Sequence, residues 1–223
     1  TNNGRGFPIP RYRTYTNAVP TIFIEEIMRN NTNITHVVID IETLGTVASM
    51  LKKGTCPILQ AAYTAVKYYP EDSQWRLMGG AGFTFSLGNQ HENHTCQETV
   101  AWHIEHNRDN YISQSKASVE THLDSADEFR KALEEIASGA SEVHYWARGK
   151  DFDFPILTSY AMQNNFTYPF MRDYAFSRIH CIRDLEKFFG IDGKQFKNSN
   201  PHDAMYDSEQ EAKVLCHWLN GGN

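Results

Sequence analysis

The chain has 223 residues, enough to bury one good core, and its 40% hydrophobic and 22% charged residues are ordinary for a globular domain. Its net charge of -6 argues against a broad basic surface that coats nucleic acid, and its four widely spaced cysteines argue against zinc-finger and disulfide frameworks. No apolar run approaches the roughly 20 residues that span a bilayer, so we expect a cytosolic protein with no membrane partner.

The N-terminal segment is predicted to be an extension. Residues 1–20 mix glycines and prolines with Arg5, Arg11 and Arg13 and have no helical or strand period, which favours an irregular basic arm. Such an arm lies on the surface or stays mobile, and contact with a phosphate backbone is the minority alternative. A short helix is predicted over 21–30, with Thr21 as its cap.

The most informative stretch follows, over residues 35–45. Its dense Val, Ile and Thr residues predict a strand buried on both faces that ends near Gly45. Asp40 and Glu42 lie two residues apart, so their side chains project from the same face of that strand. Adjacent carboxylates repel each other unless a cation lies between them. From this pair alone, a metal site and a solvated loop are equally good interpretations.

The remaining elements alternate in type after a loop that follows Gly45. Strands are predicted over 57–68 and 75–87, joined by a short turn that favours an antiparallel meander. The later elements are a helix over 96–106, a helix from Ser125 to about Gly139, a strand over 143–147, a helix over 152–163, a strand over 179–183, a helix over 184–189 and a helix over 201–220. This order predicts a mixed α/β domain whose strand after Ser141 joins the sheet by a crossover.

Two further acidic stretches lie at helix starts. Asp151 and Asp153 fall at a strand-to-helix junction, where simple N-terminal capping is the alternative to a functional role. His202 and Asp207 fall at the start of the last helix, and an isolated His–Asp pair at this spacing would more often lie on the surface without a function. The function of each stretch therefore depends on whether the fold brings them together.

Taken together, the three stretches resemble the motifs of the DEDDh (DnaQ-like) 3′–5′ exonuclease family. Asp40 and Glu42 fit the first motif, Asp153 the second, and the pair His202 and Asp207, separated by four residues, the third. The segment from Arg148 through residues 152–157 looks like the second motif of phage DexA-type exonucleases, and a bacterial exoribonuclease branch shares much of the pattern.

The resemblance implies an RNase H-like fold, with antiparallel strands 1–3, then parallel strands, and flanking helices. It divides the chain into an arm with a short helix, 1–34, and an exonuclease domain, 35–223. The sequence departs from the family in two respects. The segment before residue 35 is extra, and His103 follows Trp102 where a second aromatic residue is common.

The resemblance also implies a metal-dependent reaction at a phosphodiester. Two Mg²⁺ ions, for which Mn²⁺ can substitute, would be held about 4 Å apart by Asp40, Glu42, Asp153 and Asp207, with Asp40 bridging both. Hard cations prefer oxygen ligands, which fits a cluster without cysteine. Histidine is a common general base, and His202 is the candidate for activating the attacking water. Glu42 would also touch the terminal 3′-hydroxyl.

Weaker predictions concern substrate contacts, each with a structural alternative. Thr43, Leu44 and Gly45 could pack on the terminal nucleotide or form a simple turn. Trp102 and His103 could stack on or contact a base. Arg148 could steer phosphate or remain solvated, and Phe152 is a further candidate contact. For Trp102, packing in the core is at least as good an interpretation.

The leading hypothesis is therefore a 3′–5′ exonuclease that releases nucleoside 5′-monophosphates from single-stranded DNA or RNA 3′ ends, with DNA slightly favoured. The alternatives are an exoribonuclease or oligonucleotidase of the same fold and a non-catalytic nucleic-acid-binding module. A homodimer is possible, and the expected location is cytoplasmic, either as a phage protein in its host or in a bacterium.

Overall fold

The computed structural model describes residues 33–222, except for 55, 88–89, 91–94, 117–121, 173–177 and 197. The arm and helix predicted before residue 33 lie outside the described residues. The strands are β1 (Ile34–Thr43), β2 (Ile58–Tyr69), β3 (Gln74–Thr84), β4 (Glu142–Ala147) and β5 (Ile179–Cys181). The helices are α2 (Val47–Lys53), α3 (Gln97–His106), α4 (Arg108–Lys116), α5 (His122–Ser138), α6 (Lys150–Gln163), α7 (Ile182–Phe189) and α8 (Ala204–Leu219), with short 3-10 turns at Pro169–Met171 and Gly193–Gln195.

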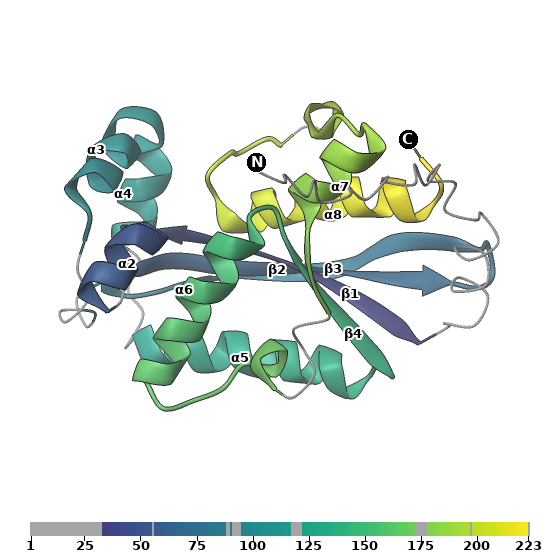
Figure 1. Cartoon of the computed structure of the whole chain (residues 1–223), viewed down its shortest axis with the longest axis horizontal. Helices are drawn as coiled ribbons and strands as arrows, with labels where there is room; N and C mark the ends of the chain where they lie inside the picture. The colour runs from purple at the N-terminus through teal and green to yellow at the C-terminus, as the bar shows by residue number, and fades with distance from the viewer. Residues whose placement is uncertain are drawn as a thin grey trace, which may run out of the picture. The chain divides into compact units, whose positions relative to one another are not determined.

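The five strands form one mixed sheet in the order β3-β2-β1-β4-β5. β1 pairs antiparallel with β2, which pairs antiparallel with β3, whereas β4 is parallel to both β1 and β5. This arrangement confirms the predicted sheet, with its antiparallel first three strands and parallel remainder. Helices α5 and α6 cover one face and α8 covers the other (Figure 1).

Alternation along β1 sends its side chains into two different environments. Val37, Ile39 and Ile41 face the apolar core that α5 and α6 share with the sheet, and Val37 and Ile39 are fully buried there. The intervening residues therefore point to the face under α8. Asp40 and Glu42 lie on this second face, as the sequence predicted from their spacing.

Small and polar residues let α8 lie close to the sheet. A Cβ on Gly82 would come within 3.2 Å of Met205 Cβ, so glycine makes room for the start of the helix. Thr64 of β2 hydrogen-bonds Ser208 of α8 at 3.0 Å. Gln60 lies opposite Glu42 in the β1–β2 ladder, and its side-chain Oε1 accepts a hydrogen bond from the backbone N–H of Ala204 at 2.9 Å. These contacts fix the first turns of α8 beside the end of β1.

The structure corrects several predicted elements. The expected loop after Gly45 contains α2, which begins with a capping box between Thr46 and Ser49. Helix α4 was not predicted, because its sequence is polar and has no apolar stripe. Ser125 does not cap α5 but lies inside it, with its hydroxyl donating to Thr84 O at 2.7 Å. No helix in the described ranges is long and apolar enough to cross a bilayer.

Candidate active site

The three acidic stretches meet at the C-terminal end of β1. Asp40 and Glu42 lie near the end of this strand, Asp153 lies in the first turn of α6, and Asp207 lies in the first turn of α8. His202 comes just before α8, which begins at Ala204 and not at the predicted residue 201. One ligand atom each from Glu42, His202 and Asp207 lie within 4.8 Å of one another. The fold thus assembles residues from distant parts of the chain.

Asp153 ties the start of α6 to the end of β1. Its side chain is 4% exposed, and its carboxylate accepts the backbone N–H of Ile41 at 3.3 Å. Ile41 lies between Asp40 and Glu42, so this bond places the Asp153 carboxylate beside both. A carboxylate in a first helical turn is favoured by the helix dipole, which explains the local placement but not its burial.

His202 and Asp207 are locked together through the backbone. The His202 N–H donates to Asp207 Oδ2 at 2.8 Å, and the Asn198 amide donates to Asp207 Oδ1. His202 has a φ of 64°, in the left-handed region that few residues other than glycine adopt. Asn107 holds this conformation from the other side, because its side-chain amide donates to the His202 carbonyl at 3.0 Å. The imidazole of His202 packs edge-on against Trp102, with ring centroids 4.6 Å apart.

The carboxyl groups of the cluster are difficult to ionise together. Burial, followed by repulsion from neighbouring acids, raises the pKa of Asp40 well above its usual range and that of Glu42 to about 8. Burial raises the pKa of Asp153 to about 7 against the opposing effect of its backbone hydrogen bonds. The pKa of Asp207 is also raised by burial, although the His202 N–H opposes this. Positive charge placed among these groups would stabilise their ionised forms.

The donor set fits a hard divalent cation. Asp40 Oδ2 is buried and has no hydrogen-bond partner, which is costly for a carboxylate unless a cation binds it. The ligand atoms available are carboxylate oxygens and one imidazole nitrogen, and oxygen is what Mg²⁺ and Mn²⁺ prefer. The cluster is therefore a candidate metal centre.

Several supporting residues were not found from the sequence. Glu211 is 3% exposed, lies one helical turn after Asp207 and faces the same cluster. Gln60 and Asn107, both 7% exposed, position α8 and the His202 backbone. Glu211 had one usable signal, because it interrupts the inward stripe that includes Ser208, Ala212 and Leu215.

The residues after Glu42 form a buried turn beside the cluster. Thr43 and Leu44 are 4% and 3% exposed, and the Thr43 hydroxyl donates to the Gly45 carbonyl at 2.8 Å. A Cβ on Gly45 would lie 2.6 Å from Cys56 Cβ, so only glycine fits there. The packing of this turn explains its sequence without a ligand, and its predicted contact with a nucleotide stays a prediction.

Trp102 and His103 differ in exposure. Trp102 is 38% exposed, reaches His202, and stacks on His106 with ring centroids 5.3 Å apart. His103 is 2% exposed, and its Nε2–H donates to the Thr43 carbonyl at 3.0 Å. This bond ties α3 to the end of β1.

The two predicted contact residues around α6 have partners within the chain. The Arg148 guanidinium lies 3.0 Å from Glu186 and remains 38% exposed. Phe152 is half-buried and packs against the core beneath α6. Asp151, one residue earlier, is exposed in the first turn of the helix.

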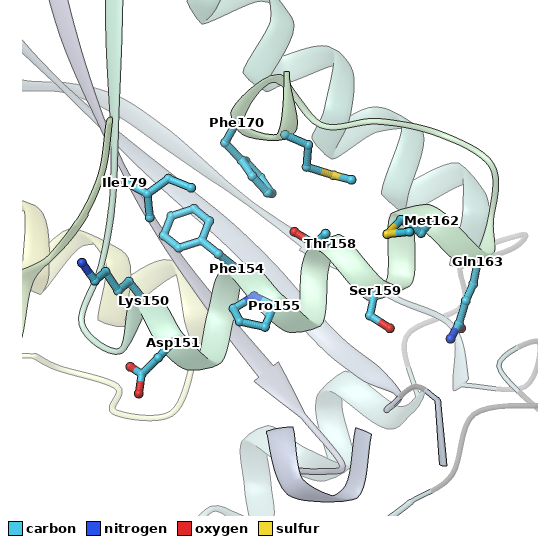
Figure 2. Close-up of a pocket in the computed structure, with 11 residues that line it drawn as sticks. Lys150, Asp151, Phe154, Pro155, Thr158, Ser159, Met162, Gln163, Phe170 and Ile179 are labelled. Carbon is cyan, nitrogen blue, oxygen red and sulfur yellow. The ribbon is translucent and has the colours of Figure 1, made fainter. Parts of the chain in front are cut away.

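A separate hollow of about 930 Å³ lies along α6. Its walls are mostly apolar and include Phe154, Pro155, Met162 and Phe170 (Figure 2). None of the four predicted metal ligands lines it. The hollow is therefore distinct from the carboxylate cluster.

Comparison with known protein families gives a match that covers most of the chain. The family model of the Rv2179c-like 3′–5′ exoribonuclease domain matches residues 35–219. No curated protein sequence matches the chain significantly.

Solved structures share the fold at low sequence identity. Cell-death related nuclease 4 (CRN-4) is 19% identical with a TM-score of 0.54, over 84% of this chain and 64% of that one. The nuclease domain of 3′hExo, a DEDDh family member bound to rAMP, is 10% identical with a TM-score of 0.52, over 85% and 94%. E. coli ExoI bound to single-stranded DNA is 13% identical with a TM-score of 0.54, over 83% of this chain and 40% of that one. This chain thus spans less than two thirds of CRN-4 and of ExoI.

Proposed function

The chain belongs to the family of Rv2179c-like 3′–5′ exoribonuclease domains, and on this basis we propose that it removes nucleotides one at a time from the 3′ end of single-stranded nucleic acid. The products would be nucleoside 5′-monophosphates. The fold supports the proposal, because DEDDh nucleases share it. The more specific likeness to phage DexA-type enzymes stays a prediction.

The observation that carries the proposal is the convergence at the end of β1. Glu42, His202 and Asp207 bring ligand atoms within 4.8 Å of one another, although they come from a strand and from a segment some 160 residues later in the chain. Asp40 and Asp153 add carboxylates to the same place. Structural packing alone does not favour burying so many acids together.

Four carboxylates of the cluster would hold the cations. We assign this role to Asp40, Glu42, Asp153 and Asp207, with two Mg²⁺ ions as the expected occupants and Mn²⁺ as a substitute. Bound there, the ions would supply positive charge to stabilise the phosphodiester transition state and to activate water. The hydrogen bond from the Ile41 N–H to Asp153 keeps that carboxylate oriented toward the others.

His202 is the proposed general base. Its backbone is fixed by bonds to Asp207 and Asn107, so the imidazole is held at the mouth of the cluster while its ring stays half-exposed. It would accept a proton from the attacking water. Trp102 supports one edge of the ring.

The 3′-terminal nucleotide would lie between Trp102 and the turn after Glu42. The exposed part of the indole would offer a base an aromatic surface beside the His106 ring that already stacks on it. Glu42 would contact the terminal 3′-hydroxyl, and Thr43, Leu44 and Gly45 would form the floor of the pocket. Of the other predicted contacts, Arg148 lies just before α6 and Phe152 lies in its first turn. His103 hydrogen-bonds the Thr43 carbonyl and so would support the turn that contacts the nucleotide.

Both RNA and DNA are candidate substrates. The matched family is described as an exoribonuclease, which favours RNA, whereas the solved ExoI complexes contain DNA. The sequence-based preference for DNA stays a prediction, and we place RNA first because the family match covers nearly the whole described chain. Homodimer formation and a cytoplasmic location also stay predictions.

The direct test uses matched 5′-labelled RNA and DNA oligonucleotides with Mg²⁺ or Mn²⁺. Wild-type protein should shorten the RNA from its 3′ end, and a 3′-phosphate should block it. Asp40→Asn and His202→Ala should lose the activity, whereas Glu209→Gln, an exposed change on α8, should keep it. Binding of the oligonucleotides without shortening would instead support the non-catalytic module.

A further inference from the structure

Glu211 is a buried acid that no motif accounts for. It lies four residues after Asp207 on α8, so both side chains project from one face of the helix. Its side chain is 3% exposed, in contrast to Asp207, which is half-buried. Acids are almost never buried this fully unless they are paired or bind a metal.

The polar contacts of Glu211 satisfy only part of its carboxylate. One oxygen accepts a hydrogen bond from the Arg148 backbone, and the other, Oε2, is buried with no hydrogen-bond partner. The Arg148 guanidinium contributes positive charge nearby, but it forms its ion pair with Glu186 at 3.0 Å. Glu211 therefore has a fixed position and an unpaired oxygen.

The unpaired oxygen belongs to the carboxylate cluster. Among the neighbouring charges, that of Glu211 raises the pKa of Asp40 most, ahead of those of Asp153 and Glu42. Asp40 Oδ2 is itself buried without a partner. A proton or a cation can balance two buried carboxylates that repel each other, and the further carboxylates around Asp40 favour a cation.

Glu209 provides the contrast on the same helix. Its side chain is 38% exposed and pairs with Lys213 at 2.7 Å, one turn away, as is ordinary for a helix surface. The burial of Glu211 is therefore a property of its position over the end of β1 and not of α8 in general.

We propose that Glu211 is a fifth acidic group of the cation site, where it acts together with Asp40 to strengthen cation binding. This inference rests on the proposed function. Its bond to the Arg148 backbone anchors it to the start of α6, so that α8, β1 and the β4–α6 junction are coupled through one side chain. Glu211 acts through Asp40 and the cations, and takes no part in proton transfer.

The test measures Mn²⁺ binding by calorimetry on the full chain, without substrate. Glu211→Gln keeps the shape and the acceptor for the Arg148 N–H but removes the charge. We expect Mn²⁺ affinity to fall by about tenfold or more, as is typical when a group behind metal ligands is removed. Glu209→Gln should bind Mn²⁺ as wild type does. The Mg²⁺ concentration for half-maximal nuclease activity should rise in parallel for Glu211→Gln.

Stability of the metal-free protein separates this role from simple packing. Removing a repelling acid should leave the melting temperature at pH 8 unchanged or higher, both in Glu211→Gln and in the apolar Glu211→Met. A packing role predicts a lower melting temperature and unchanged Mn²⁺ affinity, and that result would overturn the inference, as would failure of both variants to fold. If wild type bound no Mn²⁺, the proposed function itself would fail. Equal binding by wild type and Glu211→Gln would refute the role of Glu211 alone.

Discussion

One face of β1 carries two clusters of buried ionisable groups with opposite characters. His36 lies near the start of this strand and Asp40 and Glu42 near its end, all on the face under α8. At the histidine end, the Trp146 indole N–H donates to His36 Nδ1 at 3.0 Å, and His144 and His180 share a hydrogen bond of 2.8 Å. At the carboxylate end, Asp40 Oδ2 has no partner.

Burial shifts the pKa values of the two ends in opposite directions, and at both ends it favours the neutral form. Burial lowers the pKa of His36 to about 3 and that of His180 to about 4, so these rings stay neutral and their hydrogen bonds satisfy them. Burial raises the pKa of Glu42 to about 8, and its acidic neighbours add to the effect. At the histidine end the three rings find hydrogen-bond partners among one another and Trp146, whereas at the carboxylate end the buried Asp40 Oδ2 has none. Charge therefore distinguishes the two ends, because neutral rings can satisfy one another by hydrogen bonding and like-charged carboxylates cannot.

The largest expected effect tests the carboxylate end directly. Asp40→Asn keeps the shape of the side chain and removes a charge that would hold the cations. We expect nuclease activity to fall by at least about 10³-fold, because electrostatic stabilisation of the transition state is lost. The metal-free protein should melt no lower than wild type, since the variant relieves repulsion. Retained activity, or a loss of stability large enough to explain the lost activity, would contradict the assignment of Asp40 to a cation site.

The second test removes a partner at the histidine end. His36→Leu leaves the buried Trp146 indole N–H without an acceptor, which should cost about 1–3 kcal/mol in the free energy of unfolding. The activity of the folded protein should be unchanged. Urea unfolding of His36→Leu, Trp146→Phe and the double variant checks this, because the second change should cost less once the first has been made. Strictly additive losses would show that the pair does not act as a unit.

The sequence predicted the sheet well because its strands are dense in β-branched residues and its acids have a fixed spacing. The face on which Asp40 and Glu42 lie follows from a period of two along β1, which tertiary contacts do not alter. The motif positions Asp153, His202 and Asp207 came from resemblance, and the structure brings them together without assigning their roles. Helices α2 and α4 were missed because one depends on a Thr46 cap and the other has a polar sequence.

Positions that depend on contacts between distant elements could not be predicted. Gln60 looks like an ordinary strand residue until its amide is seen to accept from Ala204, 144 residues away. Asn107 likewise meets His202 only in the fold. Glu211 was visible as an acid in an apolar stripe, but nothing in the sequence shows that Asp40 lies opposite.

A smaller effect concerns how pH acts on the two ends. Without metal, raised carboxyl pKa values mean that the folded state holds more protons than the unfolded one, so stability should increase as pH falls from 8 to 6.5. Below pH 6.5 the buried histidines lower the stability, because His36 and His180 bind protons in the unfolded state and stay neutral in the folded state. The gain in stability between pH 8 and 6.5 should be about 2 kcal/mol and should vanish with saturating Mg²⁺. Urea unfolding at pH 8, 6.5 and 5 checks the change in stability above and below pH 6.5. A gain between pH 8 and 6.5 that persists with Mg²⁺ would contradict the cation site.

The smallest effect concerns the His202 imidazole at the carboxylate end. Asn107→Ala removes the bond that holds the left-handed His202 backbone, so His202 should sample other conformations. We expect kcat to fall about fivefold, the value of one hydrogen bond of about 1 kcal/mol, with little change in KM.

Asn164→Ala is the matched control for this change. Asn164 also ends a helix, α6, and its amide donates to the Tyr160 carbonyl at 2.8 Å, whereas Asn107 ends α3. Both variants lose an asparagine at the last turn of a helix and should lose similar stability, but only Asn107→Ala should slow the reaction. Because His202 itself is intact, the pH at which the rate of Asn107→Ala is half-maximal should match that of wild type. Equal rates for the two variants would show that the His202 loop holds its position without Asn107, and that the carboxylate end is fixed by Asp207 alone.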